Sequence, residues 1–311
     1  MRLSPTTKAT LPAALLFAAA LCFPGTASAT AILANAVQTT TLAPPSSGCY
    51  MIGLAYDTAN GQYYGEGSGN PICNGLVWNS GGALLQNIRP LNIDGRGMFY
   101  DPNTNSIQNV TYGASGLPGP LGIDYGLIAM GLNGSGLYTG ANTQLLAIVP
   151  GIADSQSVAA YNPTSDAIYS RVSNNIVDVA SHSTGALLTT ITLNFAAAGN
   201  PSMQAYSIGY DPVTDTFLTV SAVTKDAYVF GNTGAYLGSS YLGAGTPIDG
   251  NYDLAYTNGQ LFVTDGSSGI GTWRGFDIFA SQPVPEPTSL ALLCTGLAAL
   301  GLIRRRKRET A

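Results

Sequence analysis

Five aspartates between strand-like segments are the side chains with the most catalytic potential: Asp94, Asp124, Asp154, Asp249 and Asp253. Two carboxyl groups that face each other across a cleft can hydrolyse a glycosidic bond. Aspartate is, however, also a preferred residue of tight turns. We therefore name no catalytic residue, and the sequence favours a protein that is not an enzyme.

His182 is the single histidine of the chain, and Ser181 and Ser183 flank it. A Ser-His-Asp triad needs the imidazole within hydrogen-bond reach of the serine hydroxyl. Neighbours on a strand point to opposite faces, so no triad follows from this adjacency. We expect an exposed histidine in a turn.

Two of the four cysteines, Cys22 and Cys294, lie in apolar runs near the chain ends, which leaves Cys49 and Cys73. In an oxidising compartment we expect these two to form one disulfide, with two buried free thiols as the alternative. Two cysteines and one histidine are too few for a transition-metal site.

Structural calcium is a weaker alternative, because aspartate-rich turns supply hard oxygen ligands. Asp101, Asp211 and Asp215 are the relevant residues, but the chain has no Asp-x-Asp-x-Asp-Gly loop. We interpret them as turn formers and predict no metal or other cofactor.

The chain begins with features of a secretory signal peptide over residues 1–29. Arg2 and Lys8 precede an apolar stretch, and Ala27-Ser28-Ala29 is a small-residue cleavage site. We expect signal peptidase and the export machinery to act here, so that the mature chain starts at Thr30.

The chain ends with Val284-Pro285-Glu286-Pro287, an apolar run over residues 288–303, and a basic cluster at Arg304, Arg305, Arg306, Lys307 and Arg308. Basic residues cross a bilayer at high cost and stay cytoplasmic. The run is shorter than the ~20 residues that span comfortably. These properties predict a hydrophobic helix that anchors the protein transiently in the inner membrane.

This tail, residues 284–308, resembles the PEP-CTERM sorting tail of exported bacterial proteins. The resemblance implies recognition of Pro285-Glu286-Pro287 by an exosortase, and release to the cell surface or extracellular matrix. It also implies a host that makes exopolysaccharide. An ordinary C-terminal membrane anchor is the alternative.

Residues 30–283 are therefore the part of the chain that we expect to fold into a domain. They contain five basic and fifteen acidic residues, a net charge near −10 with few charges for the length. Nucleic acid requires a basic patch, so it is not an expected partner. The low charge and the abundant Gly, Ser, Thr, Asn and Tyr are typical of an extracellular β-protein.

A short phrase containing a tyrosine, then Asp or Asn and often Pro, recurs along this region. Its tyrosines, Tyr56, Tyr100, Tyr161, Tyr210 and Tyr256, stand 44, 61, 49 and 46 residues apart. A strand, a Gly-containing turn and a second strand follow in most repeats, as at Thr233-Gly234. Two hairpins per repeat of this length are typical of a β-propeller. The pattern resembles the YncE/NHL-like propellers, a resemblance that brings no catalytic motif.

We predict an all-β propeller of five four-stranded blades, at about 49–92, 93–150, 151–197, 198–246 and 247–281. Six blades are the alternative, since the second repeat is long. Residues 31–42 are β-prone and are expected to pair with the last blade and close the ring. A β-sandwich is the closest other fold, but it would lack the long repeat.

Tyrosines outside the repeat register could stack on sugar rings: Tyr63, Tyr64, Tyr112, Tyr125, Tyr138, Tyr241 and Tyr252. The leading hypothesis is a non-enzymatic protein that binds or organises the polysaccharide matrix of a biofilm or floc. A propeller enzyme, a glycan lyase or hydrolase, and a protein-interaction platform are the alternatives.

Overall fold

The computed structural model describes residues 31–45, 49–68, 73–112, 126–152, 154, 156–172, 175–252, 254–264 and 271–280. They fall within one compact unit, Ala31–Ala280. All the regular secondary structure in these ranges is β-strand, which confirms the all-β prediction. The predicted signal peptide and C-terminal hydrophobic helix lie outside the described residues.

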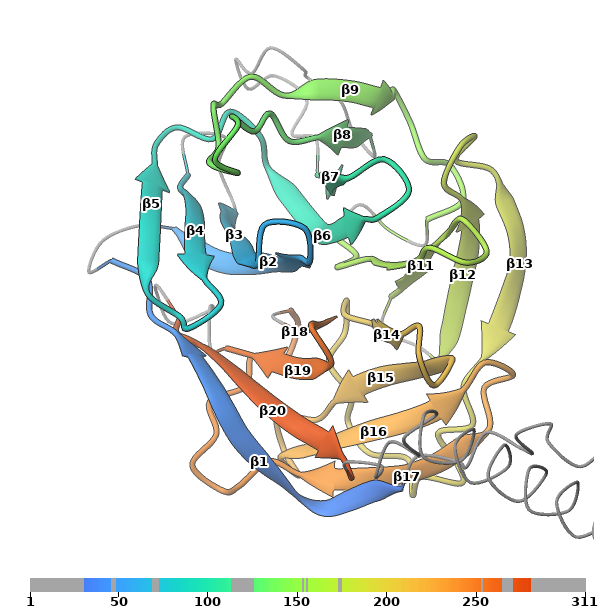
Figure 1. Ribbon diagram of the computed structural model, residues 1–311. Coiled ribbons are helices and arrows are strands. Elements are labelled where there is room, and N and C mark those ends of the chain that lie inside the picture. The colour runs from blue at the N-terminus through green and yellow to red at the C-terminus, as the bar shows by residue number, and fades with distance from the viewer. Residues whose placement is uncertain are drawn as a thin grey trace, which may run out of the picture. The chain divides into compact units, whose positions relative to one another are not determined.

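The strands form three four-stranded sheets and one eight-stranded sheet, which stand around a common centre as a β-propeller (Figure 1). The first sheet contains β2 (Tyr50–Asp57), β3 (Gln62–Ser68), β4 (Gly75–Asn79) and β5 (Leu84–Ile88). The second contains β6 (Gly95–Asp101), β7 (Ser106–Thr111), β8 (Leu127–Ala129) and β9 (Thr143–Leu146). The third contains β10 (Ala160–Asn162), β11 (Ala167–Arg171), β12 (Ile176–Ser181) and β13 (Leu187–Thr192).

The eight-stranded sheet consists of two groups of four strands. One is β14 (Gly209–Asp211), β15 (Thr216–Val220), β16 (Asp226–Gly231) and β17 (Tyr236–Tyr241). The other is β18 (Leu254–Thr257), β19 (Gln260–Val263), β20 (Trp273–Phe279) and β1 (Ile32–Leu42). A parallel pair, Asn35 with Tyr241, joins β1 to β17.

Strand β1 connects the beginning of the described chain to its end. It pairs antiparallel with β20 over a register that runs from Ile32–Phe279 to Leu42–Trp273. This pairing confirms that the N-terminal strand completes the last group. An edge strand that is paired in this way is not free to associate with other chains.

In the first four groups, the first hairpin has the Asp or Asn of the repeated phrase as the acceptor in its turn. Asp101 Oδ1 accepts a hydrogen bond from the Asn103 backbone N–H (2.9 Å), and Asp211 Oδ1 accepts one from the Val213 N–H (3.0 Å). Asp215 lies in the left-handed region at φ 55° and accepts a hydrogen bond from the Tyr210 hydroxyl. These three residues are thus used in building turns, which is the favoured sequence-based interpretation.

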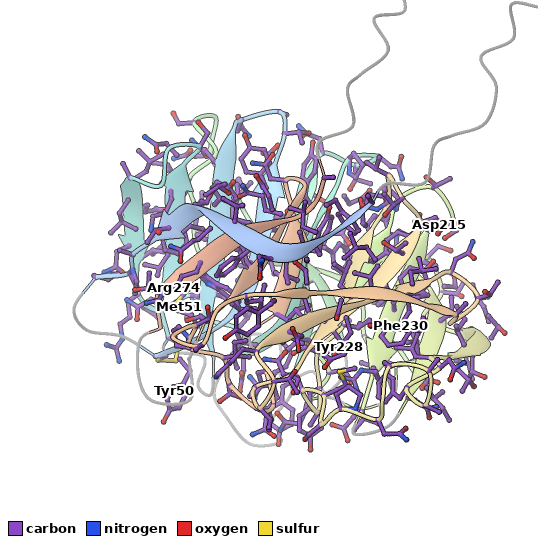
Figure 2. The ribbon with its side chains drawn as sticks, turned by 90° about the horizontal axis from the view of Figure 1, so that it is seen from below. Tyr50, Met51, Asp215, Tyr228, Phe230 and Arg274 are labelled. Atoms are coloured by element: carbon purple, nitrogen blue, oxygen red, sulfur yellow. A yellow bond between two sulfur atoms is a disulfide. The ribbon has the colours of Figure 1, made fainter. Side chains whose placement is uncertain are left out.

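The core lies between neighbouring sheets. Tyr161 and Tyr210 of the repeated phrase are buried, and the other three repeat tyrosines pack against core clusters. Tyr228 and Phe230 of β16 are also buried (Figure 2). The repeated tyrosine therefore fills the space between groups of strands, because each sheet can bury its faces only against its neighbours.

Candidate functional site

Each loop aspartate that the structure describes takes part in a hydrogen bond or an ion pair. Asp94 is buried and its Oδ1 lies 2.5 Å from Arg96 Nη1. Asp154 accepts a hydrogen bond from the Gln156 N–H (2.7 Å), and Asp249 accepts one from the Asn251 N–H (2.6 Å). Asp154 and Asp249 thus form turns, as expected. The other two candidates, Asp124 and Asp253, lie outside the described residues.

His182 connects the third sheet to the second. Its Nε2 lies 2.7 Å from Gln108 Oε1, and its Nδ1 lies 2.8 Å from Asp166 Oδ1. It lies in a turn, as expected, but its side chain is 12% exposed, so the expectation that it is exposed is wrong. Packing against the Tyr161 ring, 4.9 Å between centroids, accounts for this burial.

Cys49 and Cys73 are joined by a disulfide, with 5.5 Å between their Cα atoms. Cys49 immediately precedes β2, and Cys73 lies between β3 and β4. The bond therefore ties the start of the first sheet to its second hairpin.

A central polar cluster forms where the innermost strands begin, and we define it as Glu66, Asp94, Arg96, Asn109, Gln156 and Tyr252. The first strand of each group lies nearest the centre, as β2, β6, β14 and β18 show in Figure 1. The segments before β10 and β14 are bridged in parallel at Val158 and Ser207. Because these strands start at the same end, residues distant in sequence meet there.

Arg96 links the members of this cluster that come from different sheets. Its Nε donates to Gln156 Oε1 (3.1 Å), and the Tyr252 hydroxyl donates to the same oxygen (2.9 Å). The Arg96 guanidinium also lies 4.6 Å from the centre of the Tyr112 ring. A cation held by a carboxylate, an amide and an aromatic face is well compensated for its burial.

Glu66 is the buried acid of the cluster, and sequence reasoning missed it. It is fully buried, and Asn109 Nδ2 donates to its Oε1. Removal from water raises the pKa of the Glu66 carboxyl to about 8, and the charge of Asp94 acts in the same direction. The signal was its uniqueness, because Glu66 is the sole glutamate of residues 30–283 and stands between two glycines.

The tyrosines outside the repeat register divide between core and surface. Tyr63, Tyr64 and Tyr138 are buried, so their prediction as sugar platforms is wrong. Tyr252 is a half-buried member of the central polar cluster, and Tyr112 is half-buried beside it. Tyr241 is 38% exposed on β17, and Tyr125 lies outside the described residues.

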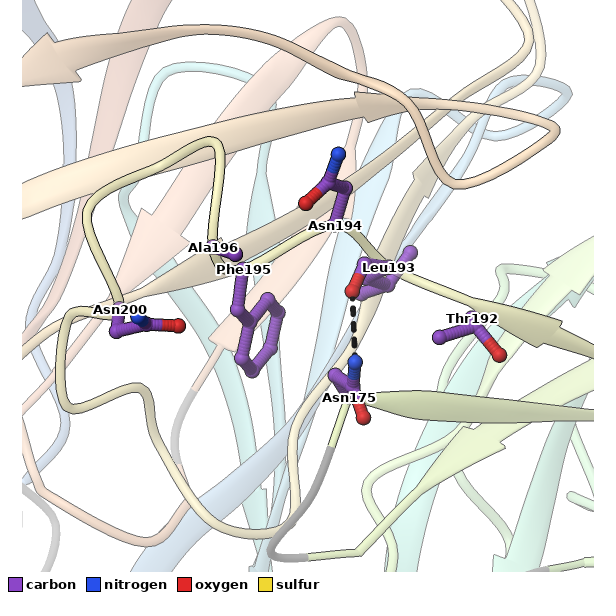
Figure 3. A pocket seen from close by; sticks show the side chains of 7 residues that line it. All are labelled: Asn175, Thr192, Leu193, Asn194, Phe195, Ala196 and Asn200. Atoms are coloured by element: carbon purple, nitrogen blue, oxygen red, sulfur yellow. Dashed lines mark hydrogen bonds between the residues drawn. The ribbon is translucent and has the colours of Figure 1, made fainter.

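A pocket of about 650 Å³ lies where β13 ends and the chain continues toward β14 (Figure 3). Its lining includes the amides Asn175, Asn194 and Asn200, the Thr192 hydroxyl and the Phe195 ring. Asn175 Nδ2 donates to the Leu193 carbonyl (3.0 Å), the bond drawn in Figure 3. None of the described residues that line this pocket is charged, so it suits an uncharged polar molecule.

The described residues contain neither a metal site nor a membrane-spanning helix. Within them, no group of three or more His, Cys, Asp or Glu side chains could hold a metal ion. No helix in the described part of the chain is long and apolar enough to cross a membrane. The predicted membrane segment, residues 288–303, lies outside that part.

Solved structures resemble this chain in fold. A Myxococcus xanthus glutaminyl cyclase is 10% identical, with a TM-score of 0.52 over 80% of this chain and 99% of that chain. A Bacteroides thetaiotaomicron protein of unknown function is 12% identical, with a TM-score of 0.43 over 78% and 72% of the two chains. At such identities the likeness concerns the fold alone. Among curated proteins, none matches the chain in sequence.

The family comparison concerns the C-terminus. Residues 283–307 match the PEP-CTERM protein-sorting motif, which confirms the resemblance found in the sequence. The motif indicates export, processing by an exosortase and sorting to the cell envelope. The chain therefore carries a PEP-CTERM sorting motif at its C-terminus, after a β-propeller.

Proposed function

We propose that this protein reaches the cell surface in three steps. Signal peptidase cleaves after Ala29, so that Thr30 begins the mature chain. Residues 288–303 then hold the protein in the inner membrane, with Arg304–Arg308 on the cytoplasmic side. An exosortase acts at Val284-Pro285-Glu286-Pro287 and delivers the protein to the surface or the extracellular matrix.

At the surface, the propeller binds or organises extracellular polysaccharide, as in a biofilm or floc, and does so without catalysis. The observation that carries this proposal is the sorting motif, residues 283–307, on a propeller whose described loop aspartates are committed to turns or to an ion pair. Five blades fit this propeller, since the eight-stranded sheet is two groups of four strands joined at Asn35 and Tyr241.

The test uses the exported protein as cells release it, mixed with the exopolysaccharide of its own host. Co-sedimentation and polymer length are followed together. We expect retention of the protein on the polymer without shortening. If the protein stays in the supernatant, and deletion of the gene leaves matrix amount and cell aggregation unchanged, the proposal fails.

A glycan-cleaving enzyme is the second candidate, favoured by one observation. Glu66 is buried beside Asp94 and Arg96, and its raised pKa of about 8 is the property of a general acid near neutral pH. Shortening of the polymer by wild-type protein, abolished in Glu66→Gln, would establish this alternative. Retention without shortening would exclude it for that polymer.

A further inference from the structure

We propose that the pocket at the end of β13 binds an uncharged sugar unit, with Phe195 against one face of the ring and amide groups around its hydroxyls. This inference rests on the proposed function of polysaccharide binding and places the sugar-binding site in this pocket. The central polar cluster lies elsewhere and takes no part in it.

The size and chemistry of the pocket define the class of ligand. Its volume of about 650 Å³ falls within the ~300–1,000 Å³ range of small-molecule sites. Among the residues that the structure describes there, the polar side chains are three amides and a hydroxyl, and none is charged. A carboxylated or sulfated sugar would lose its hydration here without gaining a counter-charge, so the preferred ligand is neutral.

The loop that forms one side of the pocket is held by its own hydrogen bonds. Asn194 Oδ1 accepts from the Ala197 N–H (3.0 Å). The Phe195 carbonyl accepts from the N–H groups of Ala198 (3.1 Å) and Asn200 (2.8 Å). Asn200 closes the turn in the left-handed region, at φ 51°. A preformed loop lowers the entropy that is lost on binding.

The Phe195 ring is fixed from two other directions. Its centroid lies 5.6 Å from that of Phe230, and the Arg171 guanidinium lies 5.8 Å from it. The ring nevertheless remains half-buried and lines the pocket. An aromatic surface held in this way can receive the C–H face of a sugar without rearrangement.

Hydrogen-bonding groups remain available around this ring. Asn175 uses one N–H for the Leu193 carbonyl, which leaves its other N–H and its oxygen. Asn200 is exposed, and its side-chain amide has no hydrogen bond to the residues that the structure describes. An amide presents a donor and an acceptor side by side, which matches two neighbouring sugar hydroxyls.

The experiment measures binding of the exported protein to neutral galactomannan, dextran and a β-glucan, with polygalacturonate as the charged comparison. We expect saturable binding to a neutral polymer. In Asn200→Gly we expect about tenfold weaker binding, since one or two hydrogen bonds of ~1 kcal/mol are lost. Phe195→Leu removes the aromatic face, keeps an apolar side chain, and should weaken binding at least as much.

The matched control is Asn105→Gly, because Asn105 is an exposed asparagine at a similar φ of 52° in the turn between β6 and β7. It should bind like wild type. Wild-type binding that survives in both pocket variants would overturn the site and leave polysaccharide binding standing. Equal loss in Asn105→Gly would also overturn the site. Binding to none of the neutral polymers, with retention on a charged host polymer, would refute the neutral-sugar assignment alone.

Discussion

Asn109 donates its amide hydrogen to the Glu66 carboxyl in a buried position where strands of the first and second sheets meet. Glu66 Oε2 and Asn109 Oδ1 have no hydrogen-bond partner among the described residues. Both lie against the point that a Cβ on Gly95 would occupy. A protonated Glu66 leaves fewer buried acceptor oxygens without a donor than the carboxylate does.

We predict that stability falls as the pH rises from about 4.5 toward 8. Burial raises the pKa of Glu66 from 4.5 to about 8, so in this window the folded protein keeps a proton that the unfolded chain has lost. The unfolding free energy then decreases with pH and levels off above the folded pKa. Urea midpoints at pH 5, 7 and 9 measure this slope.

Glu66→Gln is the control for that slope, because it keeps a neutral side chain of the same size. We expect the unfolding free energy of the variant to increase relative to that of wild type as the pH rises. The nearby charged groups Asp94 and Arg96 remain in both proteins and cancel in the comparison. An unchanged slope in the variant would show that Glu66 is not protonated in the folded state.

Gly95→Ala is predicted to destabilise the protein by about 1–3 kcal/mol or more. The added Cβ would lie 2.3 Å from both carboxyl oxygens of Glu66 and from Asn109 Oδ1, so the buried pair would have to move. Gly250→Ala is the matched control, since a Cβ there meets no atom within 4 Å. In thermal unfolding, Gly95→Ala should have a clearly lower midpoint temperature than Gly250→Ala.

Arg96→Gln is predicted to cost about 3 kcal/mol, because it leaves the buried Asp94 carboxylate without its cation. Adding Asp94→Asn should recover part of that loss, since the buried negative charge is then gone. A double-mutant cycle measured by urea denaturation gives the coupling free energy between Arg96 and Asp94. Strict additivity of the two changes would contradict the pairing as a source of stability.

Removing the disulfide should lower stability by about 3 kcal/mol, the usual effect of closing a loop of this length. The bond spans 24 residues between Cys49 and Cys73. Chemical unfolding of the Cys49→Ala/Cys73→Ala protein, compared with wild type with and without reductant, measures this contribution. Reductant should have no effect on the double variant.

Local signals made much of the fold predictable. The phrase at Tyr210-Asp211-Pro212 carries its own turn chemistry, and its recurrence at Tyr161 and Tyr256 indicates repeated sheets. The pairing of residues 31–42 with the last repeat also followed from the need to cover exposed strand edges. Tyr63 and Tyr64 were misjudged because strand β3 buries both of its faces, so alternation along the chain did not reveal their environment.

The candidate sites depend on contacts that no local pattern contains. His182 is largely buried because it reaches Gln108, 74 residues away. Glu66 acquires its raised pKa from burial, and the charge of Asp94, 28 residues away in the chain, acts in the same direction, while the hydrogen bond from Asn109 opposes it. The pocket around Phe195 likewise needs Phe230 of the next group of strands to fix the ring.

The sequence by itself determined the sorting motif at residues 283–307 and the repeated all-β character, because each is encoded in residues close together in the chain. Only the tertiary structure decided that Glu66, Asn109 and Arg96 share a buried centre, and that amides surround Phe195 at the end of β13. Burial and electrostatic environment are properties of packing, and packing joins residues that the chain keeps far apart.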